Sequence, residues 1–147
     1  MVEVSLEGTK FLDDQLKALA DPKINSAVLR AGVVAGMRKV LARAKGTVPV
    51  GTRAHKTYKG RIVAPGFASR SLRVKGTVSR DRQKATALLG VAPEAFYAVQ
   101  FIELGTARIP RRPWLVPAFE ASQEEAQAAL RDAMFKRLQK ILSKRPK

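Results

Sequence analysis

Apolar residues recur every three to four positions in two long stretches, a spacing that predicts two long helices. The first stretch runs from Ile24 to about Lys45, and the following apolar residues form its predicted face: Val28, Leu29, Val33, Met37, Val40 and Leu41. The second begins near Arg112 or at Pro117, because proline is tolerated only in the first turn of a helix. A shorter helix, with Thr9 as a possible cap, is predicted around Phe11 to Leu19.

Alternating apolar and polar residues predict three strands. The first comprises Val2, Val4 and Leu6, and the other two, Ser71 to Thr77 and Thr86 to Val91, form an antiparallel hairpin. Residues 96–104 form a short apolar run, and its pattern alone does not decide between a helix and a strand. We therefore expect one α+β domain over residues 1–147, with an antiparallel sheet of three or four strands packed by the two long helices.

Hydrophobic periodicity is lost between residues 47 and 70, where prolines and glycines are frequent. A loop of this length without secondary structure is unusual inside a compact domain. We therefore expect a flexible basic arm that becomes ordered against a neighbour. Its basic side chains, which would face an interface or DNA, are Arg53, Lys56, Lys59, Arg61 and Arg70.

The net charge of +16 is concentrated in the middle of the chain. Residues 26–84 carry fifteen Lys and Arg residues but only one acidic residue, Asp81, whereas residues 1–25 have a net charge of −2. Such a basic stretch attracts nucleic acid, an acidic protein face or a membrane surface, and charge alone does not choose among them. No apolar run is long enough to span a bilayer, and Met1 opens no signal-peptide pattern, so we expect no membrane partner.

Residues that could carry catalysis are sparse. His55 is the only histidine and is surrounded by basic residues, and the chain has no cysteine. The acidic pairs Asp13-Asp14 and Glu124-Glu125 are adjacent in sequence, so the members of each pair do not share a helix face. Pro49-Val50-Gly51-Thr52 lacks the spacing of a phosphate-binding loop. The sequence therefore predicts no enzyme, no catalytic residue, no metal site and no cofactor.

The most distinctive stretch is Tyr97 to Thr106, followed by a short basic linker and Arg112-Pro113-Trp114-Leu115-Val116-Pro117-Ala118-Phe119. It resembles the gene-product-ten-like family of HK-type tailed phages, whose members are tail-completion, neck or minor tail components. Leu104 stands where that family usually has an aromatic residue. The resemblance covers roughly residues 25–120. These residues match the family motif: Glu103, Gly105, Thr106, Arg112, Pro113, Trp114 and Pro117.

These residues also make physical sense without the family. Gly105 can adopt a positive φ and so turn the chain. Glu103 can accept hydrogen bonds from Thr106 or from the backbone of the turn, or pair with Arg112. Pro113 would fix the start of the last helix, and Trp114 and Leu115 would pack that helix on the sheet. Maintaining the fold is thus the simplest role for this motif.

The resemblance implies a structural bacteriophage or prophage protein of the head–tail junction, which completes or connects the tail as part of a closed ring. Its expected partners are a connector, a tail terminator or tail tube protein, and further copies of itself. The free chain would be a monomer in the host cytoplasm, and the basic arm would reach an adjacent ring or contact phage DNA non-specifically. The alternative is a nucleic-acid-binding protein that uses residues 26–84. A third possibility is a toxin-like or regulatory cargo protein encoded by a prophage, but the sequence offers no set of catalytic residues for such a role.

Overall fold

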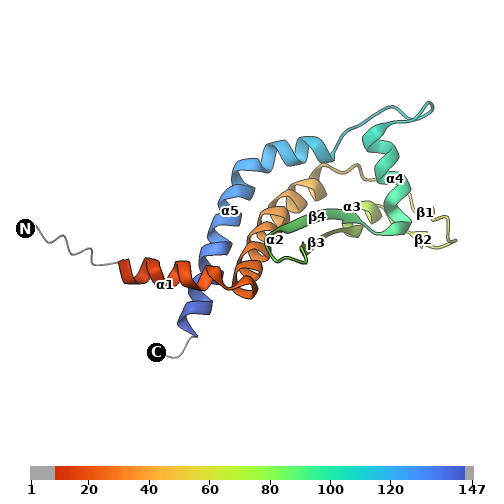
Figure 1. The fold of residues 1–147 in the computed structure, drawn as a ribbon. Helices are drawn as coiled ribbons and strands as arrows, with labels where there is room; N and C mark the ends of the chain where they lie inside the picture. The colour runs from red at the N-terminus through yellow and green to blue at the C-terminus, as the bar shows by residue number, and fades with distance from the viewer. Residues whose placement is uncertain (1–8, 145–147) are drawn as a thin grey trace, which may run out of the picture.

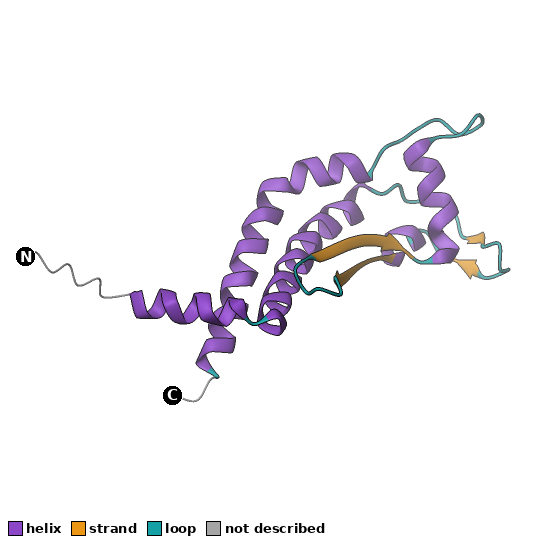
Figure 2. Cartoon of the chain, viewed as in Figure 1, coloured by secondary structure: helices purple, strands orange, loops and turns teal. Residues whose placement is uncertain are grey.

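The computed structural model describes residues 9–144, and Figures 1 and 2 show its helices and strands. Five helices and four strands follow one another in this range. Their order is α1 (Thr9–Ala20), α2 (Pro22–Thr47), β1 (His55–Lys56), β2 (Ile62–Val63), α3 (Phe67–Ser71), β3 (Leu72–Val78), β4 (Ala85–Val91), α4 (Pro93–Leu104) and α5 (Leu115–Ser143). The predicted strand at Val2, Val4 and Leu6 lies outside the described residues.

The long helices α2 and α5 lie side by side and run in opposite directions (Figure 1). α2 buries residues four positions apart, namely Val28, Gly32, Gly36, Val40 and Ala44. The two glycines bring the helices close together, because a Cβ on Gly36 would lie 2.9 Å from the Ala126 carbonyl oxygen. The predicted apolar face was therefore partly wrong. The following members of it are only half-buried: Leu29, Val33, Met37 and Leu41.

The predicted hairpin is confirmed. β3 and β4 pair in antiparallel register from Leu72 opposite Val91 to Val78 opposite Ala85. The hairpin packs on α2 at Gly76, whose carbonyl oxygen accepts a hydrogen bond of 3.3 Å from Arg30 Nε.

The expectation of a structureless loop over residues 47–70 was wrong in part. β1 and β2 form a small antiparallel hairpin with His55 opposite Val63, and α3 follows it. Val63 of this hairpin is buried. The four strands thus form two separate two-stranded sheets rather than one sheet. The turn of residues 57–61 closes one end of this pairing, and at the other end Pro65 and Gly66 lead the chain from β2 into α3. Mobility of this segment stays a prediction.

The ambiguous run at residues 96–104 is helical. Pro93 occupies the first turn of α4 and Glu94 follows it, both of which favour a helix start. Gly105 ends the helix with φ +74°. α5 begins at Leu115, between the two predicted starts.

Two apolar clusters form the core. The first joins α2, β3, α4 and the start of α5, and its buried members are Ala44, Val48, Leu72, Val99, Trp114 and Ala118. The second joins α1, α2 and the end of α5 through Ala18, Val28 and Leu138. The molecule is therefore a mixed helix-and-sheet structure in which α2 and α5 pack against the strands, and the predicted fold class is confirmed.

Candidate functional site

The carboxylate of Glu103 joins the end of α4 to the start of α5. It accepts hydrogen bonds from the backbone N–H groups of Trp114 at 2.6 Å, Leu115 at 2.9 Å and Val116 at 3.4 Å. The first N–H groups of a helix have no partner within the helix, and the positive end of the helix dipole favours an anion there. We call this arrangement the α4–α5 joint. Among residues 9–144, no hydrogen bond links the Glu103 side chain to Thr106 or Arg112, the two side-chain partners considered from the sequence.

The environment of Glu103 favours its charged form. Partial burial raises the pKa of Glu103, but the hydrogen bonds from Leu115, Trp114 and Val116 and the nearby Arg111 guanidinium outweigh it. The pKa of this carboxyl therefore lies below its ordinary value. The joint holds a carboxylate rather than a neutral acid at neutral pH.

The linker between the two helices folds back on the end of α4. The Thr106 hydroxyl accepts hydrogen bonds from the N–H groups of Arg108 and Ile109, at 3.3 and 3.0 Å. The Arg112 N–H donates to the Ile102 carbonyl at 2.8 Å. Gly105 allows this turn, because its φ of +74° and ψ of 165° suit only glycine. The side chains of Arg112, Pro113 and Pro117 are exposed.

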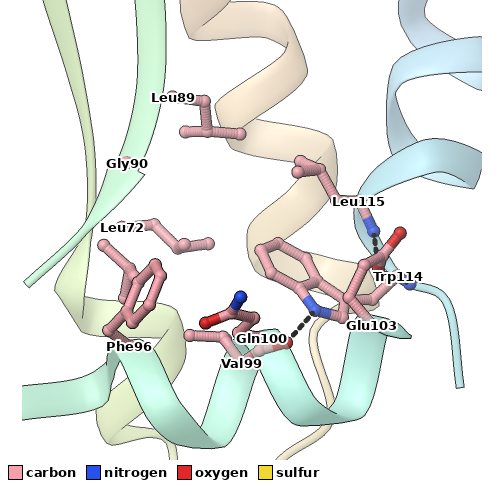
Figure 3. Close-up of a pocket in the computed structure, with 10 residues that line it drawn as sticks. Leu72, Leu89, Gly90, Phe96, Val99, Gln100, Glu103, Trp114 and Leu115 are labelled. Carbon is pink, nitrogen blue, oxygen red and sulfur yellow. Dashed lines mark hydrogen bonds between the residues drawn. The ribbon is translucent and has the colours of Figure 1, made fainter. Parts of the chain in front are cut away.

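An apolar pocket of about 340 Å³ lies beside the joint, and Figure 3 shows its lining. Trp114 is 6% exposed and its indole Nε1–H donates to the Val99 carbonyl at 3.2 Å. Leu72, Leu89 and Leu115 contribute to the same wall. Trp114 and Leu115 thus lie between α4 and the β3–β4 hairpin. Glu103 is the only charged residue of the lining, so the pocket offers packing surface rather than chemistry.

The five basic residues singled out from residues 47–70 divide into two groups. Arg70 is held by its own segment, because its guanidinium donates to the carbonyls of Pro65 at 2.9 Å and Ala64 at 3.4 Å. All five are exposed: Arg53, Lys56, Lys59, Arg61 and Arg70. Arg70 thus shapes the loop through its two hydrogen bonds while its side chain stays in contact with solvent.

A cationic hollow of about 380 Å³ lies between the β1–β2 hairpin and the start of α4. Arg61 lies 3.9 Å from the Glu94 carboxylate and 5.7 Å from the centre of the Phe67 ring. The hollow is lined by four cationic side chains, those of Lys59, Arg61, Arg70 and Arg73, against the one carboxylate of Glu94. Its excess positive charge suits an anionic group.

A second cationic hollow, of about 510 Å³, lies on the α2–α5 pair and was not anticipated. Three arginines line it with small residues between them, and no acidic residue contributes. The arginines are Arg30, Arg38 and Arg137. Arg30 and Arg38 are eight positions apart in the sequence and so lie near one another along α2, but Arg137 reaches them only through the packing of α5, which the sequence did not reveal.

Aromatic side chains also gather on the surface of α4. Tyr97, Phe101 and Leu104 are spaced to share one side of the helix, and all three are exposed. Tyr58 of the β1–β2 turn meets Tyr97 edge to face with ring centroids 5.3 Å apart, and Phe101 lies 6.1 Å beyond. We call these four residues the aromatic face. Tyr97, Phe101 and Leu104 are four and three residues apart, a spacing that places them on one side only if the segment is a helix. The sequence pattern did not decide between helix and strand here, so it did not reveal this face.

Within residues 9–144, no group of three His, Cys, Asp or Glu residues could hold a metal ion. None of the helices in this range combines the length and the apolar character needed to cross a membrane. No family model, no curated protein and no solved structure matches this chain.

Proposed function

We propose that this chain is a non-enzymatic structural protein of a tailed phage or prophage, which assembles as a ring at the head–tail junction and completes or connects the tail. Its partners in this role are further copies of itself and a connector, tail terminator or tail tube protein. It would reside in the virion, and in the host cytoplasm before assembly. No catalytic step and no cofactor belong to the proposal.

The position of the aromatic side chains carries the assembly part of this proposal. Six of the seven Phe and Tyr residues whose side chains are described are exposed, and only Phe67 is half-buried. The exposed ones are Tyr58, Phe96, Tyr97, Phe101, Phe119 and Phe135. Soluble monomers rarely leave large apolar patches in contact with water, whereas protein interfaces are enriched in aromatic residues. A protein that works in an assembly accounts for this distribution.

The placement in a phage particle rests on the resemblance of residues 97–119. In this fold Glu103, Gly105 and Trp114 of that stretch hold α4, the linker and α5 together, so the residues that carry the resemblance form one connected unit.

Electron microscopy of lysates from a parent phage that lacks this gene tests the proposal. We expect DNA-filled heads to accumulate beside unattached or incomplete tails, and complementation with the intact gene to restore joined particles. Normal joined particles without the gene would contradict the proposed role.

The second candidate function is nucleic-acid binding, and the two cationic hollows favour it. Together they gather seven cationic side chains around concave surfaces that phosphates can approach. These are Arg30, Arg38 and Arg137 in one hollow, and Lys59, Arg61, Arg70 and Arg73 in the other. Tight binding of duplex DNA by a monomer, with affinity that falls steeply as salt is added, would favour this alternative. A ring with weak affinity for DNA would favour the structural role.

A further inference from the structure

The cationic hollow between the β1–β2 hairpin and the start of α4 adjoins the aromatic face. Lys59 lines the hollow, and its Nζ lies 5.8 Å from the centre of the Tyr58 ring. Glu94 of α4 lines the same hollow, and Tyr97 lies three residues further along the same side of that helix. Cations and exposed rings therefore form one continuous surface where the hairpin lies beside α4 (Figure 1).

Hydrogen bonds fix the turn that carries Tyr58 and Lys59. The N–H of the buried Thr57 donates to the Arg61 carbonyl at 2.8 Å, and the Thr57 hydroxyl accepts from the Arg61 N–H at 3.2 Å. The Gly60 N–H donates to the Thr57 carbonyl at 2.9 Å. Tyr58 and Lys59 are both exposed on this closed turn. A ligand thus meets side chains on a backbone already in place, which reduces the cost of ordering them on binding.

The charge of this surface favours an anionic ligand. Residues 51–75 contain seven Lys and Arg residues and no acidic residue. Four of the seven line the hollow against the single carboxylate of Glu94, which lies 3.9 Å from Arg61. The four are Lys59, Arg61, Arg70 and Arg73. Because one carboxylate cannot neutralise four cations, the hollow attracts a polyanion.

The exposed rings distinguish nucleic acid from other polyanions. Tyr58 is 59% exposed, Tyr97 52% and Phe101 40%. Each nucleotide offers a phosphate for a cation and a flat base that stacks on an aromatic side chain, and this surface presents both partners side by side. An acidic peptide supplies the charges but no base. The bases of a duplex are stacked on one another, so only a single strand can place its bases on these rings.

We infer that this surface binds single-stranded nucleic acid, with phosphates in the cationic hollow and bases stacked on Tyr58 and Tyr97. Binding tolerates many sequences, because every base has a face that can stack. The inference names a strand and a surface for the nucleic-acid alternative, and it does not depend on the proposed ring. It leaves three other exposed rings for contacts between copies, namely Phe96, Phe119 and Phe135.

Fluorescence anisotropy with a labelled oligothymidylate of about 15 nucleotides tests the stacking on the full chain. Tyr58→Leu and Tyr97→Leu should each weaken binding about 5- to 100-fold, because each removes a ring and keeps an apolar side chain. Phe135→Leu is the matched control, since Phe135 is 51% exposed on α5 and does not line the hollow. A strand of the same length without bases should bind the natural chain and both tyrosine variants equally. Oligouridylate as a second probe shows whether RNA or DNA binds more tightly, and either order agrees with the inference.

A salt series with the same oligothymidylate measures the contribution of the hollow. The double change Lys59→Gln and Arg73→Gln should make the slope of log affinity against log salt concentration shallower by up to about 1.4, since each phosphate of a single strand contributes about −0.7. Arg80→Gln with Arg131→Gln is the control, because it removes the same charge from two exposed arginines outside the hollow.

Several results would overturn the inference. One is an affinity for oligothymidylate that neither tyrosine change lowers, although both variants melt at the temperature of the natural chain, as their exposure predicts. Another is displacement of the strand by poly-glutamate of equal charge, which would assign the surface to an acidic protein. A third is the absence of binding to either probe at low salt. Duplex binding that survives the tyrosine changes would keep the nucleic-acid alternative at the other hollow, and none of these results decides the ring, which the lysate microscopy tests.

Discussion

At the scale of single residues, the motif at 103–114 is an organised set of backbone contacts. Glu103 supplies acceptors to the first turn of α5, Thr106 closes the linker, and Gly105 provides a backbone conformation that other residues avoid. The sequence pointed to these residues and to the positive φ of Gly105. It did not reveal the partner of Glu103, because Trp114 and Leu115 approach that carboxylate only once the linker has folded back.

The α4–α5 joint predicts a pH-dependent contribution to stability. Glu103→Gln should lower the free energy of unfolding at pH 7 by about 0.5–2 kcal/mol, the usual cost of losing a helix cap. The pKa of Glu103 is depressed in the folded state. Its contribution is therefore fully present above the unfolded value of about 4.3 and is lost as the pH falls through the folded pKa.

Urea unfolding of both proteins between pH 3 and pH 7 measures this effect. We expect the difference in unfolding free energy between natural chain and variant to shrink toward acid pH. Glu120→Gln is the control, since Glu120 is an exposed acid near the start of the same helix. A difference that stays constant with pH would contradict the role of the carboxylate.

Gly105→Ala should destabilise the protein by about 1–3 kcal/mol, because φ +74° with ψ 165° is strained for any side chain. The added Cβ would also lie 3.0 Å from the backbone nitrogen of Arg111. Gly90→Ala is the matched control, since nothing lies within 4 Å of a Cβ at Gly90. Thermal unfolding of both variants measures the effect, and equal melting temperatures would count against the argument.

At the scale of elements, sequence periodicity predicted both long helices and the β3–β4 hairpin. Periodicity identified the buried side of α2 only in part, because it weighs large apolar residues and ignores glycine: Val28 and Val40 are buried as predicted, whereas the buried Gly32 and Gly36 were not foreseen. In the structure Gly32 and Gly36 face α5, and their lack of a side chain allows the two helices to approach. The sequence pattern also missed the short strands β1 and β2, because a strand of two residues is too short to show an alternation of apolar and polar positions.

The close approach of α2 and α5 predicts opposite effects for one substitution at two glycines of α2. Gly36→Ala should destabilise the protein by about 1–3 kcal/mol, because its Cβ would meet the Ala126 carbonyl oxygen, which cannot move independently of α5. Gly46→Ala has open space around the new Cβ and should stabilise the protein by up to about 1 kcal/mol through helix propensity. Chemical denaturation measures both, and a stabilising Gly36→Ala would show that the helices are further apart.

At the scale of the whole molecule, the buried core is small and the surface is rich in aromatic residues and cations. Twelve hydrophobic residues are buried in the described chain, and only Trp114 among them is aromatic. Sequence patterns could not separate core from candidate interface, because both use apolar residues at the same helical spacing. The positive character was evident in the sequence, but the gathering of Arg30, Arg38 and Arg137 into one hollow required the fold.

The hollow on the α2–α5 pair gives the nucleic-acid-binding alternative a quantitative test. Each phosphate neutralised on a duplex contributes about −0.9 to the slope of log affinity against log salt concentration. The triple change Arg30→Gln, Arg38→Gln and Arg137→Gln should therefore make the slope shallower by up to about 2.7. Arg131→Gln is the control, because Arg131 is an exposed arginine of α5 that does not line the hollow. Fluorescence anisotropy over a salt series measures the slopes, and equal slopes for triple variant and control would assign any DNA contact elsewhere.

The α4–α5 joint also determines how far the linker between the two helices can change in length and sequence. Because Glu103 ties the two helices directly, the stretch between Thr106 and Pro113 does not have to set the angle between them. Thr106 and Ile109 close its tip, and Ala107 and Arg108 lie exposed there. An insertion between Ala107 and Arg108 would separate Thr106 from Arg108 and Ile109, but its cost is limited to the hydrogen bonds that close the tip, because the contacts of Glu103 with α5 stay in place. The peptide bond between Ala107 and Arg108 is therefore the place to insert an epitope or a fluorescent label, and a place where related chains can vary in length without rebuilding the helices.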